Sequence, residues 1–112
     1  MSDATAVRTR LTELTLKFVT RTAEDVAQMR DALARLDAGR GADEPSALDQ
    51  IHQLAHRACG TGGTLGLDAL SDAAGDLERL VEALPRDVAP GAAERAQIAA
   101  GVDAVAAQLA RL

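Results

Sequence analysis

Two histidines, one arginine and the single cysteine of the chain lie between positions 52 and 59, directly before a run of glycines. The stretch HRACGTGGTLG, residues 56–66, holds four of the nine glycines. An imidazole is a nucleophile near neutral pH, and imidazole and thiol both suit a metal such as Zn²⁺. Glycine costs about 1 kcal/mol relative to alanine in a helix interior. A bare backbone directly behind a histidine therefore suggests a functional requirement.

A helix predicted to begin near residue 45 carries these side chains, and local propensity alone has it fray at Gly60. Its apolar residues gather on one stripe, formed by Leu48, Ile51, Leu54, Ala55 and Ala58. His56 lies about 120° from the centre of this stripe and is predicted to face solvent. Cys59 lies about 60° from the centre and is predicted to be largely buried, with His52 between the two in angle. Gly60 follows His56 by four residues and shares its face.

An exposed imidazole beside a helix surface without side chains suits a histidine that a partner must reach. A neutral imidazole has a reference pKa of about 6.5 and can attack an electrophile such as a phosphoryl group near pH 7. A protein that holds the phosphoryl group must then bring its backbone and metal ion very close. A large side chain at position 60 would obstruct this approach, which gives Gly60 a functional reason.

Other interpretations of the same residues stay open at this point. A histidine on a helix is often merely solvated, and His52 is most simply a flank residue that tunes the imidazole one turn away. His52, His56 and Cys59 form a possible Zn²⁺ face at i, i+4 and i+7, but a fourth ligand is missing nearby, so we expect no metal. The glycines could also serve close helix packing or end the helix.

The stretch from Ala55 to Gly66, AHRACGTGGTLG, resembles the signature of histidine phosphotransfer (HPt) domains of bacterial two-component phosphorelays. The positions that fit the family pattern are His56, Gly60, Thr61, Gly62, Leu65 and Gly66. Residues 67–78 are similar to the helix that follows in this family, and the resemblance covers roughly residues 7–84. It implies that the helix carrying His56 continues past Gly60 to about Thr64. Many members carry lysine three residues after the histidine, where this chain has Cys59. Arg57, or a cation of the partner, would then offset the phosphate charge.

The resemblance implies that His56 accepts a phosphoryl group from the aspartate of a response-regulator receiver domain and passes it to another receiver. Its partners would be such receivers and a hybrid or histidine kinase. The receiver would supply Mg²⁺, so this chain itself needs no cofactor. The chain would be a carrier rather than an enzyme, since it has no P-loop pattern for ATP. The alternative is a helical interaction or regulatory module that has lost phosphotransfer.

Apolar periodicity predicts an all-α protein. Helices are expected near 4–20, 22–38, 45–64, 67–84 and 91–111. Thr22-Ala-Glu-Asp25 resembles a capping box, so the first two helices are either separate or continuous with a bend. The later four fit an antiparallel four-helix bundle, with the additional N-terminal helix capping one end or supplying a dimer contact. The 112 residues are expected to form a single domain, residues 1–112.

Composition narrows the classes of partner. The net charge is −5 and the basic residues are scattered, which argues against a nucleic-acid binder. Phe18 is the single Phe, Tyr or Trp residue, so the chain lacks the aromatic side chains on which the bases of single-stranded nucleic acids usually stack. The chain has neither a long apolar run nor a signal-peptide pattern at its start, which predicts a cytoplasmic protein without a membrane partner.

Overall fold

The first helix, α1 (Asp3–Asp37), runs without a break through the N-terminal third of the chain. The computed structural model describes residues 3–38 and 44–112, apart from the side chains of residues 44 and 45. Neither Gly nor Pro occurs between positions 3 and 37, so nothing in the local sequence ends the helix. The separate N-terminal helix predicted over 4–20 is therefore wrong. Thr22, expected to cap the next helix, is 1% exposed inside α1.

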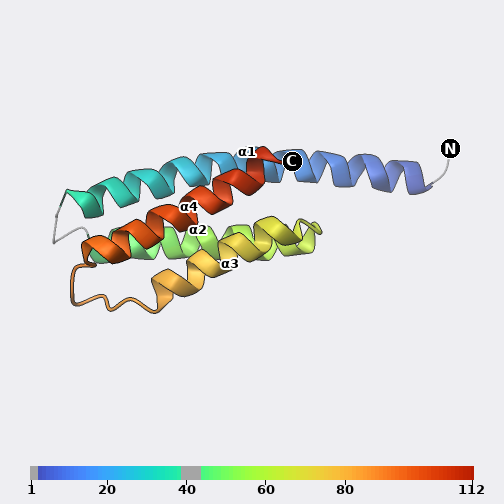
Figure 1. Ribbon diagram of the computed structural model, residues 1–112. Coiled ribbons are helices and arrows are strands. Elements are labelled where there is room, and N and C mark those ends of the chain that lie inside the picture. The colour runs from blue at the N-terminus through green and yellow to red at the C-terminus, as the bar shows by residue number, and fades with distance from the viewer. Residues whose placement is uncertain (1–2, 39–43) are drawn as a thin grey trace.

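Three further helices complete the chain: α2 (Glu44–Thr64), α3 (Asp68–Glu82) and α4 (Ala92–Ala110). They pack with the C-terminal part of α1 as an up-and-down bundle, in which α2 contacts α1 and α3, and α4 contacts α3 and α1 (Figure 1). Within residues 3–38 and 44–112 there is no strand. The predicted all-α four-helix bundle is confirmed, with α1 supplying the helix expected at 22–38. Part of the predicted loop between α1 and α2, residues 39–43, lies outside the described residues.

The glycines that follow position 60 shape the end of α2. Gly66 has a φ of +77°, a left-handed conformation that favours glycine. The Leu67 amide donates to the Gly62 carbonyl at 2.8 Å, and the Gly66 amide donates to the Gly63 carbonyl at 3.1 Å. This is the hydrogen-bond pattern of a Schellman motif, which satisfies the last carbonyls of a helix. The helix thus continues past Gly60 and ends where the resemblance implied, at Thr64.

A single apolar core fixes which faces of the helices meet. Its largest fully buried side chains come from all four helices and include Met29, Leu36, Leu48, Ile51, Leu70, Leu77 and Ile98. The stripe predicted on α2 faces this core, since Leu48, Ile51, Leu54, Ala55 and Ala58 are at most 7% exposed. The side of α2 opposite this stripe does not pack against the core and is available for a functional site.

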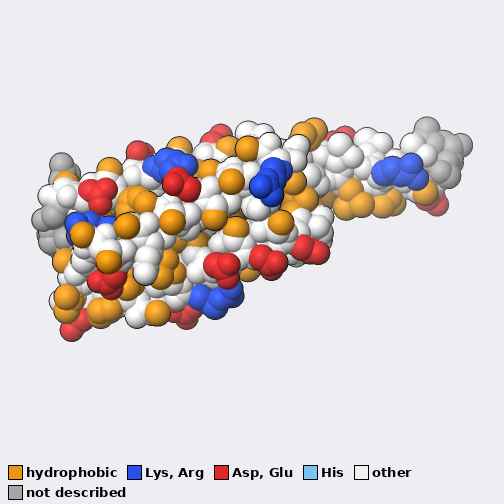
Figure 2. All heavy atoms as spheres, viewed as in Figure 1, with side chains coloured by type: hydrophobic (Ala, Val, Ile, Leu, Met, Phe, Trp, Pro, Cys, Tyr) orange, Lys and Arg blue, Asp and Glu red, His pale blue; other side chains and the backbone are white. Residues whose placement is uncertain are grey.

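The N-terminal part of α1 extends beyond the bundle as an arm (Figure 1). The molecule is 58 Å long and only 21 Å by 19 Å across. Val7, Leu11 and Leu14 on this arm remain 57%, 50% and 37% exposed, and Figure 2 shows hydrophobic side chains along one side of it. The arm therefore does not cap the bundle. Among the described residues, no helix combines the length and apolar composition that crossing a membrane requires.

The arm should contribute little to the stability of the bundle. We expect Leu11→Ala to change the free energy of unfolding by no more than about 0.5 kcal/mol, because the side chain is half-exposed and lies outside the core. The control Met29→Ala removes a side chain that is 0% exposed and should cost about 2–5 kcal/mol. Urea unfolding followed by circular dichroism measures both. An equal loss in the two variants would show that the arm is packed in solution.

Candidate functional site

His56 stands on the solvent side of α2, as predicted, with 73% of its side chain exposed. Its Nδ1 atom is hydrogen-bonded to Oε2 of Glu78 on α3. The imidazole is therefore held at one nitrogen by the neighbouring helix. Its other nitrogen, Nε2, is on the opposite edge of the ring.

Glu78 serves both histidines. Its side chain is only 17% exposed, and its Oε2 atom lies 3.8 Å from Nε2 of His52. Oε2 of Glu82 lies 4.0 Å from the same nitrogen. The two imidazole rings are nearly parallel, with centroids 6.4 Å apart and an interplanar angle of 8°. His52 thus occupies the flank position that the sequence predicted and shares a carboxylate with His56.

The register between α2 and α3 explains this arrangement. Small residues let the two helices approach: a Cβ on Gly62 would lie 3.6 Å from the backbone of Ser71, and a Cβ on Gly75 would lie 3.2 Å from Sγ of Cys59. The Ser71 hydroxyl also donates to the Cys59 carbonyl at 2.8 Å. With these contacts near the α2–α3 turn, the antiparallel helices bring Glu78 opposite His56.

The hydrogen bond to Glu78 determines where the imidazole carries its proton. An ionised carboxylate can only accept hydrogen bonds, so Nδ1 of His56 must be the donor. In the neutral imidazole the proton then sits on Nδ1, and Nε2 keeps its lone pair. The arrangement presents an oriented nitrogen nucleophile on an exposed face.

Gly60 differs from the glycines around it. A Cβ built on Gly60 would meet nothing within 4 Å, whereas one on Gly62 or Gly63 would touch Ser71 of α3 and one on Gly75 would touch Cys59 of α2. Helix packing therefore accounts for the other three but not for Gly60. The exposed backbone of Gly60 lies one turn beyond His56 on the same side of α2.

Cys59 is partly buried, in line with the prediction: it packs against the apolar core where α2 meets α3. Its Sγ atom lies 3.7 Å from the Ser71 hydroxyl. Across residues 3–38 and 44–112, no three His, Cys, Asp or Glu side chains are grouped so as to hold a metal ion.

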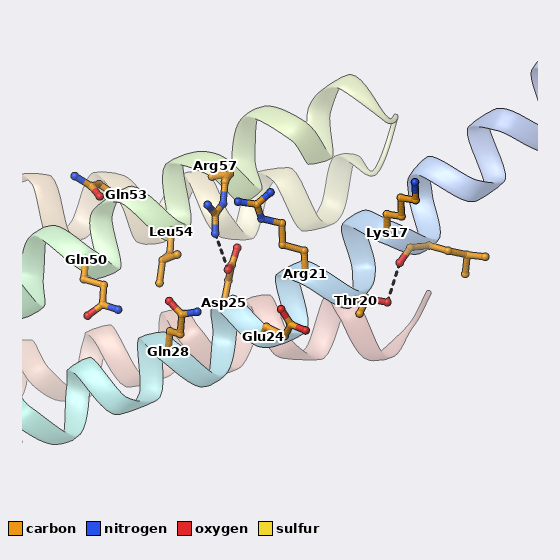
Figure 3. A pocket seen from close by; sticks show the side chains of 11 residues that line it. Lys17, Thr20, Arg21, Glu24, Asp25, Gln28, Gln50, Gln53, Leu54 and Arg57 are labelled. Atoms are coloured by element: carbon orange, nitrogen blue, oxygen red, sulfur yellow. Dashed lines mark hydrogen bonds and ion pairs between the residues drawn. The ribbon is translucent and has the colours of Figure 1, made fainter.

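Arg57 points away from His56, towards α1. Its guanidinium donates to Asp25 at 2.6 Å, and the Asp25 side chain is 4% exposed. The pair lies in a hollow of ≈ 920 Å³ between α1 and α2, into which Lys17 and Arg21 also project (Figure 3). The structure thus ties Arg57 to a buried carboxylate, and its role towards a phosphate stays a prediction.

Glu78 is the site residue that the sequence analysis missed. A signal for it exists in the pattern of α3. Glu78 directly follows Leu77 of the apolar stripe and precedes Glu82 by one turn, which puts both carboxylates at the edge of the buried face. Knowing that this edge meets the histidines of α2 requires the tertiary register.

The Glu78 contact predicts the tautomer of His56. In the folded protein above neutral pH, His56 should carry its proton on Nδ1, and Glu78→Ala should shift the population towards the Nε2-protonated form. Long-range ¹H–¹⁵N correlation spectra of the imidazole measure this directly. Finding His56 protonated on Nε2 in the unmodified chain would contradict the assignment.

The chain matches one known protein family over most of its length. The model of the Hpt domain family matches residues 13–109, which includes the C-terminal half of the arm and the whole bundle. No curated protein and no solved structure matches the chain significantly. Since the match covers most of the 112 residues, the chain belongs to the Hpt domain family.

Proposed function

We propose that this chain is a phosphoryl carrier that accepts a phosphoryl group on Nε2 of His56 from the aspartate of a receiver domain and transfers it to another receiver. The observation that supports this most directly is the imidazole itself, which is 73% exposed and bonded through Nδ1 to Glu78. Membership of the Hpt family supports the same chemistry. The proposed site consists of His56 with Glu78, Gly60 and His52 around it.

The transfer is a single displacement at phosphorus. The lone pair on Nε2 forms the new N–P bond while the bond from phosphorus to the aspartyl oxygen breaks, and the aspartate leaves as a carboxylate. The ring gains positive charge as the bond forms. Glu78 offsets this charge by accepting the hydrogen bond from Nδ1–H. The reverse displacement, by the carboxylate of a second receiver, returns the imidazole to its starting state.

The absence of a side chain at Gly60 leaves space for the receiver domain next to His56. Phosphoryl transfer depends mainly on positioning and charge neutralisation, so the receiver must place its loops and its Mg²⁺ within contact of the imidazole. The receiver supplies the Mg²⁺ in this proposal, and a hybrid or histidine kinase begins the relay. The open backbone around Gly60 is consistent with a surface that a receiver covers.

The alternative is a helical interaction module that has lost phosphotransfer. The hydrogen bond from His56 to Glu78 argues against it, because a module that only binds has no need to orient an exposed imidazole. A direct assay separates the two.

Substituting the acceptor should abolish labelling. When the chain is incubated with a receiver domain phosphorylated by acetyl phosphate and Mg²⁺, the unmodified chain should gain one phosphoryl group by mass spectrometry. His56→Gln should gain none, because an amide cannot form the phosphoramidate bond. His52→Gln should still be labelled. Labelling of His56→Gln would overturn the assignment, and no labelling of the unmodified chain by any receiver would favour the interaction module.

Gly60 should matter for transfer but not for folding. Gly60→Ala should raise the free energy of unfolding by about 1 kcal/mol, because the site is open and alanine favours a helix. Gly60→Leu should also fold, yet its transfer rate should fall by about a hundredfold, since about 1 Å of displacement can cost that much. Thermal melting and the receiver assay measure the two effects. Normal transfer by a folded Gly60→Leu variant would show that the partner does not need this space.

A further inference from the structure

We propose that Arg79 of α3 holds the phosphoryl group once it is on His56. The inference deepens the proposed carrier function and assigns the phosphate-binding cation of the site. The proposal rests on two observations: Arg79 and Cys59 meet at Gly75, and Glu78, the residue before Arg79, is hydrogen-bonded to His56.

Phosphorylation of His56 would add negative charge next to several carboxylates. A phosphoryl group carries up to about two negative charges near neutral pH. It would stand on a ring already bonded to the Glu78 carboxylate, beside α3, which carries five carboxylates between Asp68 and Glu82. A positively charged side chain close to the phosphoryl group is needed to offset this repulsion.

Two arginines are available on the helices that form the site. Helices α2 and α3 contain one arginine each, Arg57 and Arg79, and no lysine. Arg57 is bonded to the buried carboxylate of Asp25 on the α1 side. Releasing it would leave that carboxylate buried without its partner, which is costly. Arg79 therefore remains as the cation that can serve His56 within these two helices.

Arg79 is already directed towards α2. Its side chain extends back towards the start of α3, as helical side chains do, and lies against Gly75. Nη1 of Arg79 is 3.3 Å, and Sγ of Cys59 is 3.2 Å, from the point where a Cβ on Gly75 would stand. The guanidinium and the Cys59 thiol thus border the same point above Gly75, and Cys59 is three residues, or just under one helical turn, from His56.

The present partner of Arg79 does not prevent the new contact. Arg79 is paired with Asp76 at 2.5 Å, and the two side chains are 68% and 77% exposed. Exposed ion pairs of this kind contribute little to stability, so exchanging Asp76 for the phosphoryl dianion costs little free energy. A guanidinium also has five N–H donors and can keep Asp76 while it binds a phosphoryl oxygen.

The experiment loads His56 chemically, which makes it independent of any receiver. The full chain carrying His52→Gln is phosphorylated with potassium phosphoramidate, and the ³¹P signal of phosphohistidine is titrated with pH. If Arg79 contacts the phosphoryl group, Arg79→Ala should raise the pKa of that group by about 0.3 pH unit, because a nearby cation favours the dianion. The difference should shrink in about 1 M NaCl, where the Debye length is about 3 Å.

Matched variants separate a local contact from a change in net charge. Arg30→Ala removes an arginine that pairs with Asp103 between α1 and α4, and it should leave the titration unchanged. Adding Cys59→Lys to Arg79→Ala should restore the lower pKa, because position 59 lies beside the same point in space. The proposal would be overturned if the phosphoryl group had the same pKa with and without Arg79, or if Arg79→Ala and Arg30→Ala shifted that pKa equally.

Failure of the carrier function would look different. A chain that no phosphorylated receiver labels, but whose chemically loaded phosphohistidine still senses Arg79, refutes the relay and leaves the phosphate contact intact. A chain that receivers label normally, but whose phosphohistidine ignores Arg79, refutes only the present inference.

Discussion

The close approach of α2 and α3 is the constraint on which the site depends. Glycines at positions 62 and 75, with Ser71 between the helices, remove the side-chain bulk that would hold the two backbones apart. This approach sets the register, and the register brings the Glu78 carboxylate to Nδ1 of His56. A histidine that would otherwise rotate freely on an exposed helix is thereby oriented by a residue 22 positions away in the sequence.

The glycine-rich stretch has three separate physical roles. Gly66 adopts a left-handed conformation and ends α2. Gly62 and Gly63 lie against Ser71 of α3. Gly60 has open space around it, so neither packing nor backbone conformation explains it. A single sequence pattern thus combines a helix end, a packing surface and an open approach to the imidazole.

The sequence predicted the features that depend on local periodicity. The buried stripe of α2 and the exposure of His56 follow from the angle of each residue around one helix. Apolar periodicity and turn residues predicted the approximate bounds of α3 and α4, whereas the end of α2 came from the family resemblance. Features that depend on contacts with a neighbouring helix were predicted less completely. The pairing of Arg57 with Asp25 depends on the position of α1, and the hydrogen bond of His56 with Glu78 depends on the register of α3. Of the two alternatives left open near Thr22, the continuous helix is the one observed, because a threonine can sit buried within a helix as well as cap one.

The central claim is that Glu78 occupies Nδ1 of His56 and leaves Nε2 as the phosphoryl acceptor. The most direct test is to phosphorylate the chain with a phosphorylated receiver and to determine by ³¹P and ¹⁵N NMR which ring nitrogen carries the phosphorus. The structure predicts phosphorus on Nε2, with a proton still on Nδ1. Phosphorus on Nδ1 would contradict the account, because Nδ1 would then have to leave its hydrogen bond with Glu78.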